Sequence, residues 1–383
     1  MAGMLPRARH ALAALLALSA GAAGCRLVLA IEEKQLVPGD DGAAPSPGAD
    51  GAAEAAPGDD AGVDAPVGDG GCTGGRTRCA AGCVDLAADA TNCGYCGHAC
   101  KASCTTGRCV ARVAWELGAH PSQLVQSGSA LFIASDASGG RVRRLLGVDN
   151  ALLASGVGSS ARLVVAEPYL YWIAPVPGKV SRVGTDTTGL VDLASGEPGT
   201  GLLATDGSDL FFTKAGVAGA VRVMSAGGGP ATTIASLATP SALAVDATNV
   251  FFSGSAAPDV GVWRTDKTGA GRFKIHPGPA GAIVLSGDHA FVYDVDKSSI
   301  VRVAKAGDQP ALTLVPGTTI AGMDVDATHV YYTLATGEVY RVSRDGGPRE
   351  PVAVAQETPT DIVAGAADAV YWVAATRIYT APK

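Results

Sequence analysis

The side chains best suited to chemistry in this chain of 383 residues are its nine cysteines. One of them, Cys25, stands alone near the amino terminus. The other eight lie close together, at Cys72, Cys79, Cys83, Cys93, Cys96, Cys100, Cys104 and Cys109. Eight cysteines can pair as four disulfides, whereas the ninth thiol needs a different explanation. The short spacings from Cys93 to Cys100, with His98 between them, also fit a zinc site, so the cellular compartment must decide between the two chemistries.

The first 25 residues indicate that compartment. Arg7 and Arg9 precede an apolar run from Ala11 to Ala20, and small residues follow up to Cys25, which is the layout of a secretory signal. The run is too short to span a bilayer as a permanent helix. We therefore expect residues 1–24 to be a signal peptide and the eight clustered cysteines to form disulfides. Their order stays open, because eight cysteines allow about 105 pairings.

Cys25 has two interpretations. Signal peptidase could cut after Ala22, since Ala20 and Ala22 form an A-x-A pattern. Alternatively, the AAGC sequence that ends at Cys25 resembles a bacterial lipobox. Because the odd thiol favours the second interpretation, we expect lipid on Cys25. The resemblance implies an exported lipoprotein of the bacterial cell envelope, anchored in the outer membrane or at the cell surface.

The segment that follows is compositionally unlike the rest of the chain. Residues 26–71 contain ten acidic side chains and two basic ones, and residues 38–71 contain almost no large apolar side chains. Such a segment cannot bury enough surface to offset the entropy of ordering. We expect residues 25–71 to be a lipid anchor followed by a disordered linker rich in Asp, Gly, Ala and Pro.

Residues 72–110 predict a small module held together by disulfides. The segment is too short for a sizeable hydrophobic core, so covalent bonds must stabilise it. Its NCGYCGHAC stretch, residues 92–100, resembles the small cysteine-rich modules of many exported bacterial lipoproteins. This resemblance concerns the location of the protein more than its activity.

The remainder of the chain, residues 111–383, is a repeat. Apolar doublets recur every 40 residues, at Leu131–Phe132, Tyr171–Trp172, Phe211–Phe212, Phe251–Phe252, Phe291–Val292, Tyr331–Tyr332 and Tyr371–Trp372. Each unit has four short strand-like pieces separated by turn residues, which is the size of a β-propeller blade. Glycine and β-branched residues interrupt any long helical pattern. The sequence therefore predicts an all-β fold.

We expect a seven-bladed β-propeller, with six blades as the alternative. The last unit has only three strand-like pieces before Lys383, and the apolar segment 110–117 can supply the missing fourth strand and close the ring. The doublets, followed by a pattern of an apolar residue, any residue and Arg, as in 170–183 and 330–342, resemble YWTD-type and related propeller repeats. That resemblance covers residues 121–383 and implies the fold.

Residues that recur once per unit are expected to be scaffold. Asp206, Asp246 and Asp326 each precede a polar turn and should accept backbone N–H bonds there. Arginines recur in the same way, at Arg144, Arg182, Arg222, Arg264, Arg302 and Arg341. A binding site is therefore expected among residues that break the repeat.

Those residues lie in the loops that lead into the first strand of a unit or join its second strand to its third. The candidate binding residues are His120, Arg162, Glu197, His276, Asp294, Asp296 and Asp361. Asp294 and Asp296 could bind Ca2+ through carboxylate oxygens, although their sequence favours an ordinary polar hairpin. We expect neither a catalytic residue nor a protein metal ligand among them.

Composition and motifs narrow the function further. Most of the net charge of −7 belongs to the linker, so the repeat region is nearly neutral and lacks the basic surface that nucleic acid requires. No G-x-S-x-G, H-E-x-x-H or P-loop motif is present. We expect a monomeric recognition module for a protein, peptide or glycan, without a cofactor and attached to the membrane through its lipid anchor alone. The alternative is an exported propeller enzyme, of lactonase or lyase type, that uses a divalent cation such as Ca2+.

Overall fold

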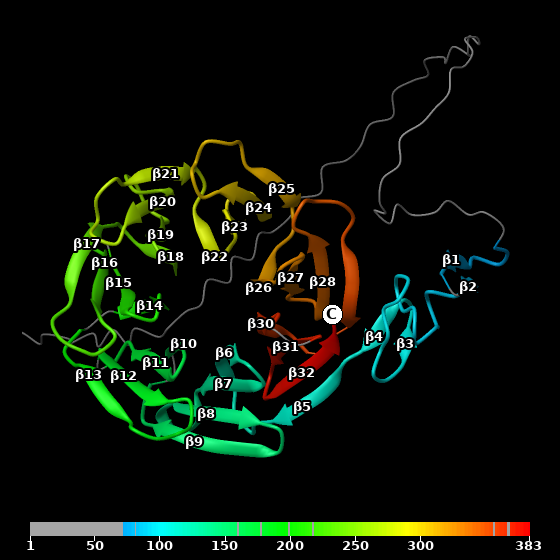
Figure 1. Ribbon diagram of the computed structural model, residues 1–383, viewed down its shortest axis with the longest axis horizontal. Coiled ribbons are helices and arrows are strands. Elements are labelled where there is room, and N and C mark those ends of the chain that lie inside the picture. The colour runs from blue at the N-terminus through cyan, green and yellow to red at the C-terminus, as the bar shows by residue number, and fades with distance from the viewer. Residues whose placement is uncertain are drawn as a thin grey trace, which may run out of the picture. The chain divides into compact units, whose positions relative to one another are not determined.

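The computed structural model describes residues 72–383, except 81, 159–160, 177, 198–199, 217, 355–356 and 366–367 (Figure 1). The predicted signal peptide, the anchor at Cys25 and the linker lie outside the described residues. The described chain is almost entirely β-strand, with one short 3-10 helix, η1 (Ala137–Gly139). None of its helices is long and apolar enough to cross a membrane.

Seven antiparallel sheets stand side by side around a central axis (Figure 1), and we number these blades in chain order. Blade 1 contains β6 (Pro121–Ser127), β7 (Ala130–Ser135), β8 (Arg141–Leu146) and β9 (Asp149–Ser155). Blade 2 contains β10 (Arg162–Ala166), β11 (Tyr169–Ala174), β12 (Lys179–Gly184) and β13 (Val191–Ala194). Blade 3 contains β14 (Thr200–Thr205), β15 (Asp209–Lys214), β16 (Ala220–Ser225) and β17 (Thr232–Ser236).

Blade 4 contains β18 (Pro240–Val245), β19 (Asn249–Gly254), β20 (Gly261–Asp266) and β21 (Phe273–His276). Blade 5 contains β22 (Ala280–Ser286), β23 (His289–Asp294), β24 (Ser299–Ala304) and β25 (Leu312–Val315). Blade 6 contains β26 (Ile320–Val325), β27 (His329–Leu334), β28 (Glu338–Ser343) and β29 (Glu350–Val354). Blade 7 contains β30 (Pro359–Val363), β31 (Ala369–Ala374), β32 (Arg377–Pro382) and, from the other end of the propeller segment, β5 (Arg112–Glu116).

Ring closure follows the sequence prediction. β5 pairs antiparallel with β32, with Trp115 opposite Ile378 and Val113 opposite Tyr379. The first strands of the blades surround the axis, and β30 of the last blade packs against β6 of the first. The fold is therefore a seven-bladed propeller, and the six-bladed alternative is excluded.

The apolar doublets form the core between blades. The second strand of a blade is covered on both faces, so two successive large side chains are buried in opposite directions. Phe211 packs towards Phe252 of blade 4, whereas Phe212 packs towards Tyr171 of blade 2. In blade 1 the register places Phe132 opposite Val125, as Tyr171 lies opposite Val164 in blade 2. The packing doublet of blade 1 is therefore Phe132 and the following isoleucine, one residue later than the 40-residue spacing predicts.

The disulfide module joins the propeller at blade 6. Its strands are β1 (Thr77–Cys79), β2 (Gly82–Val84), β3 (Cys104–Thr105) and β4 (Arg108–Val110). Four disulfides link Cys72–Cys83, Cys79–Cys96, Cys93–Cys104 and Cys100–Cys109. β4 adds in parallel to the outer strand β29, and the Arg108 guanidinium donates a hydrogen bond to the Tyr340 hydroxyl at 2.8 Å. The module thus covers the outer edge of one blade.

Four of the six recurrent arginines, Arg144, Arg182, Arg264 and Arg302, bind backbone of the following blade, whereas Arg222 pairs with Glu197 and with its own blade. Arg144 donates to the carbonyl oxygen of Thr185 at 3.0 Å, and Arg264 donates to that of Lys305 at 3.1 Å, each reaching the turn between the third and fourth strands of the following blade. Arg341 in blade 6 has no such turn ahead of it, because blade 7 takes its fourth strand from β5. The Tyr95 ring of the disulfide module covers the Arg341 guanidinium instead, at 4.2 Å.

Candidate binding face

The seven candidate residues belong to one side of the ring, which we call the candidate face. It consists of the loops that lead into first strands and those that join second to third strands. His120 and Asp296 are exposed there, and Arg162 begins β10 in a partly buried position. The His120 backbone N–H donates to the Asp136 carboxylate at 3.1 Å, which ties two loops of blade 1 together.

His276 and Asp294 form a buried pair across the boundary between blades 4 and 5. The imidazole Nε2 lies 2.7 Å from Asp294 Oδ2, and the exposed fractions of the two side chains are 3% and 0%. The other carboxylate oxygen accepts the backbone N–H of Lys297 at 3.1 Å, which closes the turn after β23. The Asp294 carboxylate is therefore occupied inside the fold, and the acidic turn has the hydrogen bonding of a polar hairpin. The other imidazole nitrogen, His276 Nδ1, is buried and has no hydrogen-bond partner among the described residues.

Asp361 caps backbone at the inner edge of the ring. Its carboxylate accepts the N–H groups of Leu124 at 2.8 Å and Ile362 at 3.0 Å, and Leu124 belongs to the first strand of the next blade. Burial raises the pKa of Asp361 to about 6, while the two backbone hydrogen bonds act in the opposite direction. First strands have no partner on the channel side, so a side chain that accepts their free N–H groups stabilises the ring.

The sequence analysis missed two further side chains that bind backbone groups of first strands at the inner edge of the ring. Asp324 accepts the N–H of Ala364 at 2.7 Å, and burial raises its pKa. The Gln123 amide exchanges two hydrogen bonds with the backbone of Leu163, at 2.7 and 3.1 Å. The available signal was a polar residue within an otherwise apolar first strand, as in the sequence Met323-Asp-Val325.

Glu197 pairs with Arg222 across the neighbouring blades, so its carboxylate also has a structural partner. The candidate residues consequently fall into two groups. His276, Asp294, Asp361 and Glu197 are bound within the protein, whereas His120 and Asp296 face solvent and Arg162 is partly exposed. The structure does not gather the seven side chains into one cluster.

The repeated turn aspartates lie on the opposite face of the ring. Asp246 accepts the backbone N–H groups of Thr248 and Asn249 at 3.0 and 2.8 Å, as a turn-opening residue should. It also pairs with Lys305 of the next blade at 2.9 Å. Although burial alone raises the pKa of Asp246, the hydrogen bonds from Lys305 and the turn hold it at about 2. Asp206 and Asp326 likewise pair with lysines from later blades.

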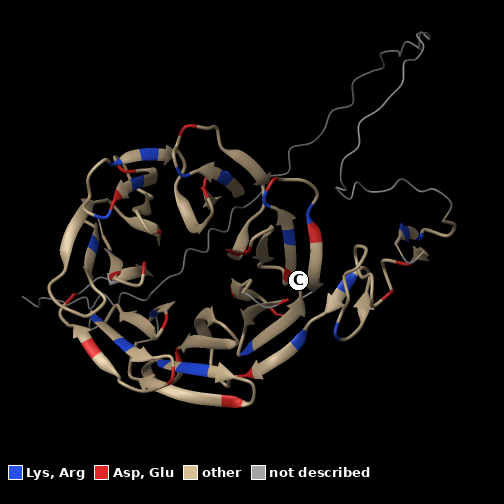
Figure 2. Ribbon diagram, viewed as in Figure 1, with Lys and Arg blue, Asp and Glu red and all other residues tan. Residues whose placement is uncertain are grey.

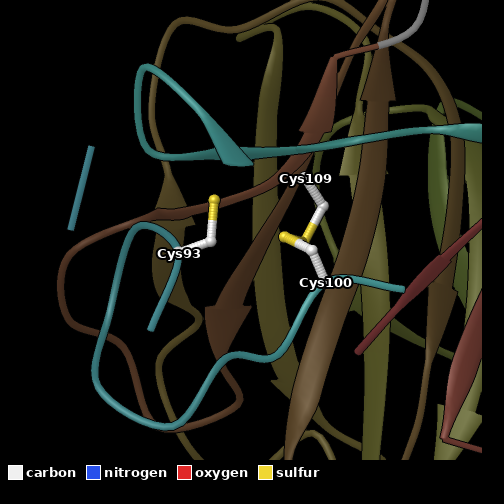
Figure 3. A group of neighbouring side chains, drawn as sticks. All are labelled: Cys93, Cys100 and Cys109. Atoms are coloured by element: carbon white, nitrogen blue, oxygen red, sulfur yellow. A yellow bond between two sulfur atoms is a disulfide. The ribbon is translucent and has the colours of Figure 1, made fainter. Parts of the chain in front are cut away.

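Only one group of possible metal ligands has suitable spacing in the part of the chain that the structure describes. The sulfur atoms of Cys93, Cys100 and Cys109 all lie within 4.8 Å of one another (Figure 3). Cys100 is bonded to Cys109 and Cys93 to Cys104, so these sulfurs are disulfide sulfurs and not thiolates. His98 is buried beside them and donates Nδ1–H to the Cys93 carbonyl oxygen at 2.6 Å.

Two hollows are open to solvent on the opposite face. One, of about 480 Å3, is lined by the turn after β26 and by Lys383. The other, of about 860 Å3, lies between the turns of blades 4 and 5 and contains Arg264, His289 and Lys305. Their cationic groups already pair with protein oxygen atoms, including Arg264 with a backbone carbonyl and Lys305 with Asp246.

Known structures share this architecture at low sequence identity. The chain is 12% identical to a streptogramin B lyase, with a TM-score of 0.57, covering 70% of this chain and 95% of that one. It is 11% identical to the extracellular domain of a one-component system from B. thetaiotaomicron, with a TM-score of 0.55, covering 71% of this chain and 39% of that one. A nidogen/laminin complex matches at 12% identity and a TM-score of 0.48, covering 58% and 92%.

No protein-family model matches this sequence, and no curated protein matches it. Fold, repeat and covalent bonds together define the class of protein. It is a seven-bladed β-propeller with a disulfide-rich module bound to its sixth blade. Four disulfides in so short a module are typical of exported and extracellular proteins.

Proposed function

We propose that this protein is an exported, lipid-anchored β-propeller of the bacterial envelope that binds a protein, peptide or glycan on its candidate face. The observation that carries the proposal is that some side chains of the loops are bonded within the fold, whereas others are exposed. The side chains best suited to catalysis, His276, Asp294, Asp361 and Glu197, are bound within the fold. The loops present other side chains to solvent.

Those exposed side chains are of the kind that recognition uses. Val176 in the loop after β11 and Val295 in the loop after β23 are exposed apolar residues. Asp296 and Lys297 stand beside Val295, and His120 lies at the start of blade 1. Apolar contacts bordered by polar groups are the usual composition of a binding surface.

The anchor is tested on the exported protein. Radioactive palmitate should label the wild-type chain and not Cys25→Ser, and mass analysis should find a lipid-modified residue at the mature amino terminus. An unmodified terminus at Ala23 would disprove the anchor. These two experiments test only the membrane attachment of the protein, because they do not involve the candidate face.

Binding is tested with arrays of glycans and peptides probed with the purified exported protein. A ligand found in this way should bind Val176→Asp/Val295→Asp at least about tenfold more weakly, since both apolar contacts are replaced by charges. Asp308→Lys, an exposed substitution on the opposite face, is the matched control. A ligand whose affinity changes only in the control would move the site to the opposite face.

Metal analysis separates recognition from the enzyme alternative. Purified protein should contain no stoichiometric divalent ion that is lost on substitution of Asp361 or His276. Finding such an ion, together with an activity that disappears with it, would replace the recognition proposal by a metal-dependent enzyme.

A further inference from the structure

Exposed apolar side chains concentrate on one arc of the outer rim. Ten large apolar residues are exposed within the described ranges, and six of them belong to the third and fourth strands of blades 7, 1 and 2 or to the turns between these strands. We call these six residues the apolar rim: Val113, Leu146, Val148, Leu152, Leu190 and Val191. Blades 3 to 5 contribute only Leu312 from the corresponding strands. The arc therefore differs from the rest of a ring built from equivalent units.

The centre of this arc is a hairpin with an apolar tip. β8 and β9 are joined by Gly147 and Val148, and the positive φ of 59° at Gly147 permits the tight turn. Val148 is fully exposed there, with exposed Leu146 before it and exposed Leu152 in the following strand. Turn tips are normally polar, so three apolar side chains around one tip indicate a surface that is covered in use.

The charges of the arc are unbalanced in one direction. Three of its four acidic side chains have cationic partners, since Glu116 pairs with Arg377, Asp149 with Arg144 and Asp192 with Lys179. The fourth, Asp186, accepts hydrogen bonds from the backbone N–H and the hydroxyl of Thr188. Three cations of the arc, Arg112, Arg141 and Arg143, have no acidic partner among the described residues. Figure 2 shows these basic positions on β5 and β8.

The apolar and cationic side chains are neighbours. Arg143 lies directly opposite Leu152 in the sheet, so these two side chains share one face of blade 1. Cations without acidic partners are complementary to a negatively charged surface, and the exposed apolar groups beside them are complementary to hydrocarbon below that surface. Phospholipid headgroups and acyl chains have this arrangement.

We propose that the apolar rim docks on an anionic lipid bilayer, with Val148 and Leu152 in the acyl boundary and Arg112 and Arg143 at the headgroup phosphates. The inference goes beyond the lipid anchor and rests on the proposed envelope location. A bilayer explains the rim better than an added protein strand does. An added strand would bind through backbone hydrogen bonds, which use neither the apolar tip at Val148 nor the cationic groups of Arg112 and Arg143.

Vesicle flotation of the exported Cys25→Ser protein tests the rim without the anchor. We expect the protein to float with phosphatidylglycerol-containing vesicles, to bind pure phosphatidylcholine less, and to detach as salt rises. Leu146→Asp/Val148→Asp should lower binding at least about tenfold, because charges replace the inserted apolar groups. Leu312→Asp is the matched control, since Leu146 and Leu312 have the same exposed fraction, 38%, and lie in different blades.

Three results would overturn the inference. The first is absence of binding of the Cys25→Ser protein to anionic vesicles. The second is a double variant that binds like its parent; Val148→Asp alone, at a fully exposed position, gives the same test if the double variant does not fold. The third is a dimer in light scattering that the double variant dissociates, which would assign the rim to a second copy of the chain.

The outcomes for anchor and rim can be separated. If palmitate does not label the wild-type chain and the Cys25→Ser protein still binds anionic vesicles, the anchor is wrong and the rim stands. If palmitate labels the wild-type chain and the Cys25→Ser protein ignores vesicles, the anchor stands and the rim inference is wrong.

Discussion

The buried pair of His276 and Asp294 gives the sharpest quantitative prediction. Substituting His276 by alanine leaves the Asp294 carboxylate, whose exposed fraction is 0%, with the Lys297 backbone N–H and a lysine Nζ 3.9 Å away. An uncompensated buried charge costs about 3 to 5 kcal/mol when its partner is removed. We therefore expect His276→Ala to lower the free energy of unfolding by about that amount.

Asp294→Asn should behave very differently. An asparagine oxygen can still accept the Lys297 N–H, and its NH2 group can donate to the neutral imidazole, so no charge is left buried. We expect a loss of about 1 kcal/mol. In the double variant His276→Ala/Asp294→Asn no carboxylate charge is buried at position 294. Asp294→Asn should therefore recover about 2 kcal/mol of the unfolding free energy that His276→Ala removes.

Urea denaturation followed by circular dichroism measures all three variants. A double-mutant cycle with Lys179→Ala and Asp192→Asn is the control, because this ion pair is exposed, with side chains 42% and 54% exposed. The coupling energy between Lys179 and Asp192 should be below about 1 kcal/mol. Additive effects of the two substitutions at 276 and 294, or a His276→Ala loss no larger than that of Lys179→Ala, would refute the structural role of the pair. Catalytic use of the pair would then have to be reconsidered.

Three other substitutions test the ring and its closure. Deleting residues 112–116 removes the outer strand of blade 7 and should abolish cooperative thermal unfolding, so a stable cooperative melt of that variant would contradict closure by β5. Tyr95→Ala uncovers the Arg341 guanidinium and should lower the unfolding free energy by about 1 to 3 kcal/mol in urea titrations, whereas an unchanged midpoint would mean that the Tyr95 ring does not stabilise blade 6. Because burial raises the pKa of Asp361 from 3.8 to about 6, its contribution to stability is present below pH 4 and is lost as pH rises through 6. Asp361→Asn should remove this dependence, on the order of 3 kcal/mol, and parallel pH–stability curves for variant and wild type would exclude it.

The repeat could be predicted from sequence because its period is carried by buried doublets. Both residues of a doublet must be large and apolar when the strand is covered on both faces, so the pattern persists through seven blades. The unmatched strand at the carboxyl end likewise predicted closure by the segment after Cys109, since three strands leave an edge unpaired. Turn acids such as Asp246 could be assigned because their partners are two and three residues away.

Contacts between blades could not be predicted in the same way. Asp294 and His276 were separate candidates in the sequence, and only the stacking of blade 5 on blade 4 makes them one pair. The role of Asp361 depends on a backbone N–H 237 residues away. The doublet in blade 1 was placed one residue early, because Leu131 is also apolar and buried and hydrophobicity cannot distinguish the two registers.

Several contacts that break the repeat lie near the closure of the ring. At the position of Asp361 in the first strand, blades 3, 4 and 5 have Leu202, Ala242 and Ala282, which cannot cap backbone. Polar caps from Asp324, Asp361 and Gln123 bind the inner edges of blades 7, 1 and 2 instead.

On the outside, β5 completes blade 7 and the disulfide module covers blade 6 and its Arg341. The seam of this ring lies inside blade 7, where β32 and β5 pair without a peptide connection between them. The polar contacts around this seam therefore stabilise closure. The exposed loops of the candidate face and the apolar rim are not needed for it, so they remain available for a ligand and a membrane surface.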